Sequence, residues 1–137
     1  MKRNKGGIEV CMKYEKLEHF VKRGQNFNIV VIHSYREGLK EHSWCLYVIL
    51  FPAHPLYKKA IQNDSDYDTD LGNKIYPWFH GGCTFYNKQS NYVKIGCDYM
   101  HIHDDEFVHE SEMPAQVDLD AEDMFEYFDK GYKEAKE

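Results

Sequence analysis

The sequence predicts a single α+β domain, in which a mainly antiparallel sheet of four to six strands carries a C-terminal helix on one face. The chain has 137 residues, which is enough for one hydrophobic core. Aromatic residues make up 15% of it, including 11 Tyr and 8 Phe, and this favours strands. Residues 117–137 repeat apolar side chains every three or four positions, as an amphipathic helix does. We therefore assign residues 1–137 to one domain and expect residues 1–7 to be a flexible arm.

The first half of the chain is expected to supply several strands. Residues 8–14 alternate apolar and polar side chains, and residues 14–22 have the spacing of a short helix, so we predict a strand followed by a helix. Residues 27–33 are rich in β-branched side chains and predict a second strand. Residues 44–51 are apolar throughout, which is typical of a central strand buried on both faces. The polar residues 34–43 between them are expected to form a loop or loose hairpin connection.

Residues 62–74 are polar and acidic, and we expect them to form a solvated loop. Aspartates alternate along this segment, as they do at the start of a calcium-binding EF-hand loop. Such a loop needs Gly at its sixth position and Glu at its twelfth, but Thr69 and Ile75 stand there. A calcium site is therefore not expected.

The C-terminal helix has the clearest end signals in the chain. Asp118 or Asp120 is expected to cap its start, and lysines occupy its last turns. Residues 107–116, which include Pro114, are expected to form an irregular link before it.

The chemically interesting side chains concentrate in residues 78–106. Two aromatic-rich runs flank a polar link at residues 87–91, which predicts two antiparallel strands joined by a tight loop. His80 lies near the start of the first run, and Asp98 lies at the end of the second. Pairing of the runs would place the outer ends of both strands together. We therefore expect His80 to lie near residues 98–104.

One interpretation of this cluster is a divalent metal site. His101 and His103 fall on one face of an extended backbone, and this His-x-His spacing offers two imidazoles to one ion. His80, Asp104 or Asp105 would supply a third ligand. A water bound at the open position would be acidified and would attack a phosphodiester or an amide.

A metal-free interpretation uses many of the same residues. His80 and His101 would act as acid and base, with Asp98 or Asp104 orienting one of them. The Thr84 hydroxyl and the amides of Gly81 and Gly82 would bind a phosphate or carbonyl oxygen; Gly-Gly alternatively marks only a tight turn.

A second candidate position is the Pro-rich bend after the central strand. Pro52 and Pro55 fix the backbone around His54, and a rigid bend there either presents this side chain to a ligand or is merely capped by it.

The cysteines and the lengths of the apolar runs predict the cellular compartment of the protein. None of the four cysteines forms a Cys-x-x-Cys pair, and each lies in or beside an apolar run, so buried thiols are expected. The longest apolar run, residues 44–55, is too short to span a bilayer, and no apolar run follows the basic start as in a signal peptide. We expect a cytoplasmic protein with no membrane partner.

Charge is distributed unevenly along the chain, which has a net charge of -6. Residues 1–60 carry 11 Lys and Arg against 5 Asp and Glu, whereas residues 98–137 carry 3 against 14. The overall acidity argues against binding of duplex nucleic acid but permits a small anionic ligand. The acidic C-terminal region would also suit a basic groove on a partner protein, or it is only a solvated helix face.

Three motifs resemble a group of small bacteriophage and prophage proteins of unassigned activity. The motifs are His-Pro-Leu-Tyr at residues 54–57, His-Gly-Gly-Cys-Thr-Phe-Tyr at residues 80–86, and Gly-Cys-Asp-Tyr-Met-His with a later Asp at residues 96–104. The resemblance covers about residues 44–104, and the departures from the group's pattern at Ala53, Cys83 and Cys97 remove no polar group. It implies a phage protein acting in the host cytoplasm. It selects, as site residues, His54, His80, Thr84, Asp98, His101 and Asp104.

The resemblance passes over His103 and so favours a mixed His/Asp/Thr pocket over the metal site. We consider three functions for such a pocket and surface. The first is hydrolysis of a phosphodiester or nucleotide, such as a signal used in host defence. The second is sequestration of the same ligand, with Tyr57 and Tyr99 among the aromatic side chains that would stack on a base. The third is binding of a host protein by the acidic C-terminal region. The sequence does not decide whether the protein is an enzyme or how many copies assemble.

Overall fold

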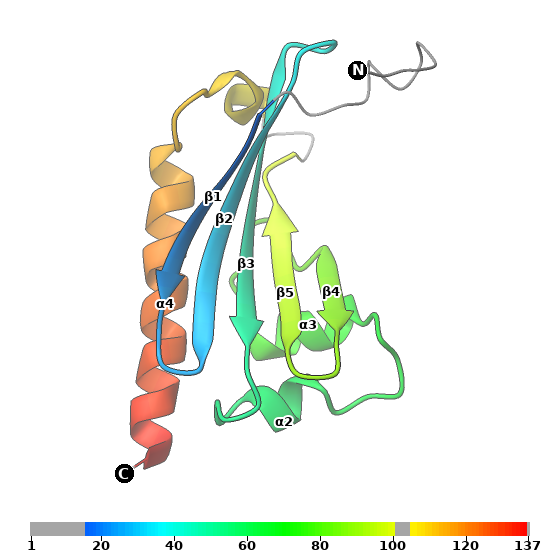
Figure 1. The fold of residues 1–137 in the computed structure, drawn as a ribbon, viewed down its shortest axis with the longest axis vertical. Coiled ribbons are helices and arrows are strands. Elements are labelled where there is room, and N and C mark those ends of the chain that lie inside the picture. Colours follow the sequence, from blue (N-terminus) through cyan, green and yellow to red (C-terminus); the bar gives the residue numbers. More distant parts are fainter. Residues whose placement is uncertain (1–15, 101–104, 137) are drawn as a thin grey trace.

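The computed structural model describes residues 16–100 and 105–136, and it confirms the predicted fold class: an antiparallel sheet with a C-terminal helix along one side (Figure 1). The five strands within these residues lie in the order β1-β2-β3-β5-β4, and each pairs antiparallel with its neighbours. The elements are β1 (Lys16–Arg23), β2 (Phe27–Arg36), β3 (Glu41–Leu50), α2 (Tyr57–Ala60), α3 (Thr69–Ile75), β4 (Phe85–Lys88), β5 (Val93–Asp98), the 3₁₀ helix η1 (Asp105–His109) and α4 (Ala115–Lys136).

One face of the sheet, the covered face, carries the hydrophobic core. Ile29 of β2 pairs with Val48 of β3, and Val48 pairs with Ile95 of β5, so the three side chains lie in one row. The neighbouring rows repeat this pattern, and all three residues are at most 2% exposed. The described helices pack on this face, where Met124 and Phe128 of α4 are fully buried.

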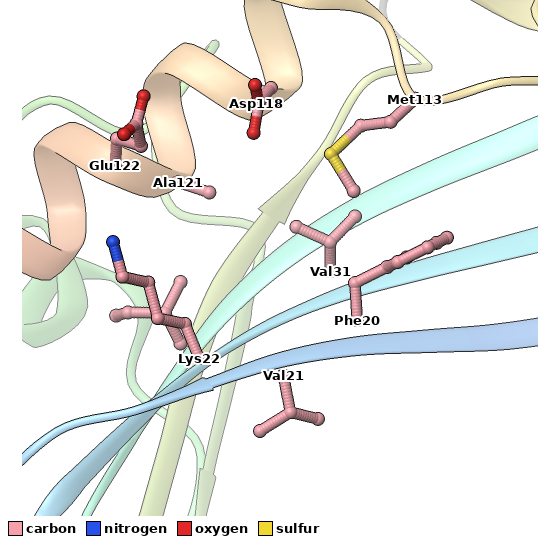
Figure 2. Close-up of a pocket in the computed structure, with 9 residues that line it drawn as sticks. Phe20, Val21, Lys22, Val31, Met113, Asp118, Ala121 and Glu122 are labelled. Carbon is pink, nitrogen blue, oxygen red and sulfur yellow. The ribbon is translucent and has the colours of Figure 1, made fainter.

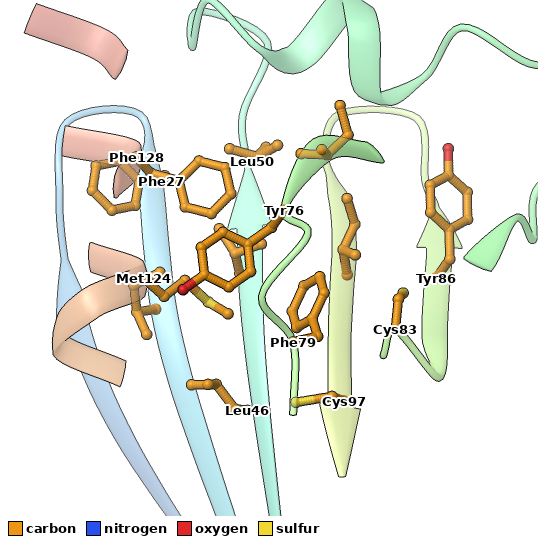
Figure 3. Close-up of a cluster of buried hydrophobic side chains, with 14 of the residues drawn as sticks. Phe27, Leu46, Leu50, Tyr76, Phe79, Cys83, Tyr86, Cys97, Met124 and Phe128 are labelled. Atoms are coloured by element: carbon orange, nitrogen blue, oxygen red, sulfur yellow. The ribbon is translucent and has the colours of Figure 1, made fainter. Parts of the chain in front are cut away.

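Aromatic side chains from distant segments close the core (Figure 3). Phe27 lies 5.1 Å from the ring of Phe125 and 6.0 Å from that of Phe128, which joins β2 to α4. Tyr86 of β4 is fully buried and donates a 2.6 Å hydrogen bond to the carbonyl of Ala60 at the end of α2. Edge-to-face and tilted ring pairs of this kind add to the free energy gained by burying apolar area.

The sequence prediction was wrong about the secondary structure of residues 14–22. The described part of this segment belongs to β1, which pairs along its whole length with β2. Leu17 and Val21 are exposed on one face of the strand while Phe20 points to the other, so the residues do not form one buried helical stripe. The strand expected at residues 8–14 lies outside the described residues.

The segments expected to be loops are more ordered than the sequence indicated. Residues 34–43 extend β2 to Arg36 and begin β3 at Glu41, so only a tight turn separates the strands. Residues 69–75 form α3, because the Asp68 carboxylate caps it by accepting a 3.0 Å hydrogen bond from the Leu71 amide. The link expected at residues 107–116 overlaps the end of η1 and the first residues of α4.

The expected hairpin of β4 and β5 is present, but its first strand is short. Only Phe85–Lys88 is extended, and residues 78–84 form turns in which Gly81 and Gly82 have φ angles of 68° and 90°. Two consecutive left-handed residues cannot continue a strand. The C-terminal helix is confirmed, although it begins at Ala115, directly after Pro114, so Asp118 and Asp120 lie inside it and do not cap it.

A cavity of 280 Å³ separates the edge strand β1 from α4 (Figure 2). Phe20 and Val31 form its apolar floor, and Asp118 and Glu122 of α4 lie on its opposite wall. None of the predicted site residues that the structure describes lines it. None of the helices in the described ranges is long and apolar enough to cross a membrane.

The packing predicts opposite effects for two glycine-to-alanine changes. Gly96→Ala is expected to lower the free energy of unfolding by about 1–3 kcal/mol, because the new methyl group would overlap the Leu46 carbonyl and the Tyr47 ring. Gly131→Ala is expected to raise it by up to about 1 kcal/mol, since its methyl group would lie in α4 with its nearest neighbour 3.9 Å away. Urea unfolding of both variants measures the difference, and equal effects would contradict this packing.

Candidate functional site

His80 lies at the end of the sheet where β5 stops, in the turn that leads to β4. Its ring stacks on Tyr99, with 4.5 Å between centroids and 16° between planes, and meets the edge of Phe107 in η1. Tyr99 is 1% exposed and donates a 2.6 Å hydrogen bond to Asp120 of α4. Burial, and then this bond to Asp120, raise the pKa of Tyr99. The half-buried imidazole therefore has a rigid, neutral aromatic wall behind it.

The two glycines after His80 shape the turn. The Gly82 amide donates to the Phe79 carbonyl at 2.9 Å, and the Cys83 amide donates to Asn73 Oδ1 at 2.8 Å. These two N–H groups are therefore already bonded within the protein. The arrangement favours the tight-turn interpretation of the Gly-Gly pair over an oxyanion site at Gly82.

Thr84 and Asp98 meet beside this turn. The Thr84 hydroxyl donates a 3.0 Å hydrogen bond to Asp98 Oδ2, and Asp98 Oδ1 accepts another from the Met100 amide. Because successive residues of a strand point to opposite faces, Asp98 and Tyr99 leave the end of β5 on different sides. The structure thus gathers four predicted residues at one end of the sheet, with His80 and Tyr99 on the covered side and Thr84 and Asp98 at the rim.

His54 and Tyr57 lie at the other end of the sheet. Leu50 pairs with Val93 and Cys45 pairs with Asp98, so the bend after β3 is a full strand length from the end of β5 (Figure 1). His54 is 2% exposed, its Nε2 lies 3.0 Å from the Phe128 carbonyl, and its Nδ1 accepts the Leu56 amide. His54 consequently ties the Pro-rich bend to α4 and does not join His80.

The remaining predicted ligands, His101, His103 and Asp104, lie outside the described residues. Within the described ranges, no group of three or more His, Cys, Asp or Glu side chains could hold a metal ion. The metal site therefore stays a prediction. Buried thiols are confirmed for Cys83 and Cys97, since burial raises the pKa of both and makes them poor nucleophiles.

The sequence prediction missed a network of polar side chains on the covered face. His33 of β2 is fully buried, with its Nδ1 2.7 Å from Glu18 Oε1 and its Nε2 2.8 Å from His42 Nδ1. The His33 ring lies 4.1 Å from Trp44, whose carbonyl accepts the Tyr99 amide, so this network lies at the same end of the sheet as His80. Its sequence signal is His33, which continues the inward-facing positions 27, 29 and 31 of β2.

No model of a protein family, no curated protein and no solved structure matches this chain. The phage relationship that the three motifs suggest therefore stays a prediction.

The buried state of His54 predicts a pH dependence of stability. Desolvation lowers the pKa of His54 below its ordinary value of 6.5, so the unfolded chain binds a proton that the folded chain resists. The free energy of unfolding should therefore fall as the pH drops below about 6.5. His54→Ala should cost about 2–4 kcal/mol near pH 7.5 and should reduce this acid-dependent fall.

The matched control is His109→Ala, since His109 is exposed in η1. Urea unfolding between about pH 5.5 and pH 7.5 should give this control the same fall as the unchanged protein. An equally large fall in His54→Ala would contradict the assignment.

Proposed function

We propose that the end of the sheet where β5 stops binds a small phosphate ester, such as a nucleotide, and hydrolyses its phosphodiester or phosphoester bond. The observation that carries this proposal is that two segments, residues 80–84 and 98–99, meet at one end of the sheet, where His80 stacks on Tyr99 and Thr84 bonds to Asp98. Imidazole changes its charge near neutral pH and is suited both to hold a phosphate and to transfer protons.

The hydrogen bond of Thr84 refines the role of each residue. Because the only hydroxyl proton of Thr84 goes to Asp98, this oxygen can accept a hydrogen bond but cannot donate one to a phosphate. Thr84 and Asp98 are therefore suited to accept hydrogen bonds from a donor group of the ligand, such as a ribose hydroxyl or the amino group of a base. His80, held against Tyr99, is the side chain suited to the phosphate and the acid or base role.

The same geometry suits sequestration without cleavage, since both functions begin with the same binding step. The motif resemblance suggests a phage protein, for which a nucleotide signal of host defence is a fitting ligand. Recovery of the bound ligand, intact or cleaved, distinguishes the two functions.

Incubation of the purified protein with cyclic and linear nucleotides, with and without EDTA, tests the proposal. His80→Ala should lower turnover by about 100-fold or more, because it removes the acid or base. Thr84→Val should weaken binding by about tenfold, since it removes one acceptor and changes the setting of Asp98. Chromatography measures the products, and calorimetry measures the affinity.

His19→Gln is the control, because His19 is an exposed histidine of β1 that lies outside this site. It should leave turnover and affinity unchanged. Binding with the ligand recovered intact would establish sequestration in place of hydrolysis. An absence of binding by every nucleotide tested, or His80→Ala behaving as the unchanged protein, would overturn the proposal.

A second candidate function is supported by an aromatic groove of 390 Å³ beside α4. The indole of Trp78 is 65% exposed and packs edge-to-face against Tyr76 and Tyr127. Asp123, Glu126 and Lys130 of α4 also line the groove, so its charged side chains are two carboxylates and one ammonium group. An indole face beside two carboxylates suits an arginine or lysine side chain of a basic segment on a partner protein.

Titration with an oligo-arginine peptide, followed by tryptophan fluorescence, tests this second function. Changing Asp123 and Glu126 together to Lys should weaken the affinity by about tenfold or more, as the carboxylates are lost from the groove. The control changes Asp118 and Glu122 to Lys, which alters charge equally but beside β1. Equal weakening by both pairs would show unspecific attraction and contradict a groove site.

A further inference from the structure

We propose that the aromatic groove beside α4 recognises a lysine side chain that carries two or three methyl groups. This inference rests on the second candidate function, because it names the chemical form of the basic side chain that the groove would bind. The lining consists of three aromatic rings, two carboxylates and one ammonium group, which belong to Tyr76, Trp78, Tyr127, Asp123, Glu126 and Lys130. A methylated lysine keeps its positive charge but has methyl groups in place of N–H groups.

The three rings stand nearly perpendicular to one another. The planes of Trp78 and Tyr76 differ by 74°, those of Trp78 and Tyr127 by 70°, and those of Tyr76 and Tyr127 by 73°. The corresponding centroids are 5.5, 5.4 and 5.2 Å apart. Three such planes can meet like the faces at the corner of a box, and all three rings line the same groove. A cation in that corner would lie within about 6 Å of each centroid, which is the range of cation–π attraction.

The indole of Trp78 is held in place although most of it faces solvent. It is 65% exposed, whereas Tyr76, against which it packs, is 4% exposed and belongs to the core. On the other side, the Tyr127 hydroxyl donates a 3.0 Å hydrogen bond to the Ile75 carbonyl, which fixes the second ring that contacts Trp78. A large aromatic side chain that stays exposed at a fixed position is typical of a binding surface.

The charges around the groove favour a cation. Asp123 and Glu126 contribute two negative charges from α4, and Lys130 offsets one of them. Burial, and then the negative charges of Asp123 and Asp120, raise the pKa of Tyr76 to about 12, so this ring is neutral at physiological pH and the Asp123 carboxylate acts on it. A cation in the corner is therefore attracted by the aromatic rings and by a nearby carboxylate.

Methylation changes the free energy that is needed to remove the ammonium group from water. An unmodified ammonium group is compact and strongly hydrated, and aromatic rings do not replace the hydrogen bonds that it loses. Methyl groups remove those donors and add apolar surface against the rings, while the positive charge is kept. The groove of 390 Å³ falls within the range of about 300–1,000 Å³ that is usual for small-molecule sites, so it accommodates the head group with part of its hydrocarbon stem.

Calorimetric titration of the unchanged protein with four versions of one short peptide tests the inference. The peptide has one central lysine between two arginines, and this lysine is unmodified, dimethylated, trimethylated, or replaced by a neutral analogue in which carbon stands for the trimethylated nitrogen. The dimethylated and trimethylated peptides should bind about tenfold more tightly than both the unmodified peptide and the carbon analogue.

The outcomes separate this inference from the second candidate function. Equal affinity for the unmodified and methylated peptides would overturn the inference but leave a groove for basic segments. Equal affinity for the carbon analogue would show that apolar contact alone is recognised, and would overturn it as well. An absence of binding by all four peptides would overturn both.

Two variants assign the preference to the groove. Trp78→Leu should bring the affinities for the trimethylated and unmodified peptides to a ratio of about one, because the most exposed ring of the corner is lost. The matched control is Tyr67→Leu, since Tyr67 is 61% exposed but does not line the groove, and it should keep the tenfold ratio. A preference for methylated lysine that survives Trp78→Leu would overturn the inference.

Discussion

The pairing register of β2 and β3 fixes which side chains of these two central strands lie on the covered face. Phe27 lies opposite Leu50 at one end, and Arg36 lies opposite Glu41 at the other. A shift by one residue would move every side chain of one strand to the opposite face, and the buried apolar rows make such a shift costly. The same register places His33 beside Trp44 on the covered face. Burial of hydrocarbon along most of the two strands therefore holds the polar network at their end.

The two ends of the sheet make different uses of histidine. At the end where β5 begins, His54 is buried and bonded to two backbone groups, and its neutral form stabilises the contact with α4. At the other end His80 and His42 are half-buried, and each is backed by an aromatic or imidazole partner. Imidazole rings that are held in place but are still partly exposed to solvent are suited to proton transfer and ligand binding. The Pro-rich motif is thus a structural feature, although the motif resemblance grouped it with the site.

Much of the fold could be predicted because local patterns coincide with tertiary ones. The apolar run at residues 44–51, the hairpin of β4 and β5 and the final helix all follow their hydrophobic periods. The gathering of His80, Thr84 and Asp98 followed from the hairpin alone. The hairpin pattern does not predict that His80 lies on the covered side while Thr84 and Asp98 lie at the rim. This arrangement depends on the residue at which β5 ends. The role predicted for the Gly82 amide did not anticipate the turn, in which this amide donates to the Phe79 carbonyl.

The His33 network escaped prediction because its three residues were assigned to three kinds of element: Glu18 to a helix, His33 to a strand and His42 to a loop. Tyr35 and His42 pair across the hairpin, yet their polarity suggests exposure to solvent. Only hydrogen bonds between strands make this polarity tolerable near a core. Sequence periodicity describes one strand at a time and cannot show such bonds.

The position of α4 has a consequence for the way the chain folds as it is made. β1, β2 and β3 form consecutive hairpins and can pair early, whereas the rings of Phe125 and Phe128 that cover Phe27 come about one hundred residues later. Until that helix leaves the ribosome, the apolar side of the first hairpins has no cover from it. Nascent chains at this stage would expose a hydrophobic surface, which is the kind of surface that molecular chaperones bind.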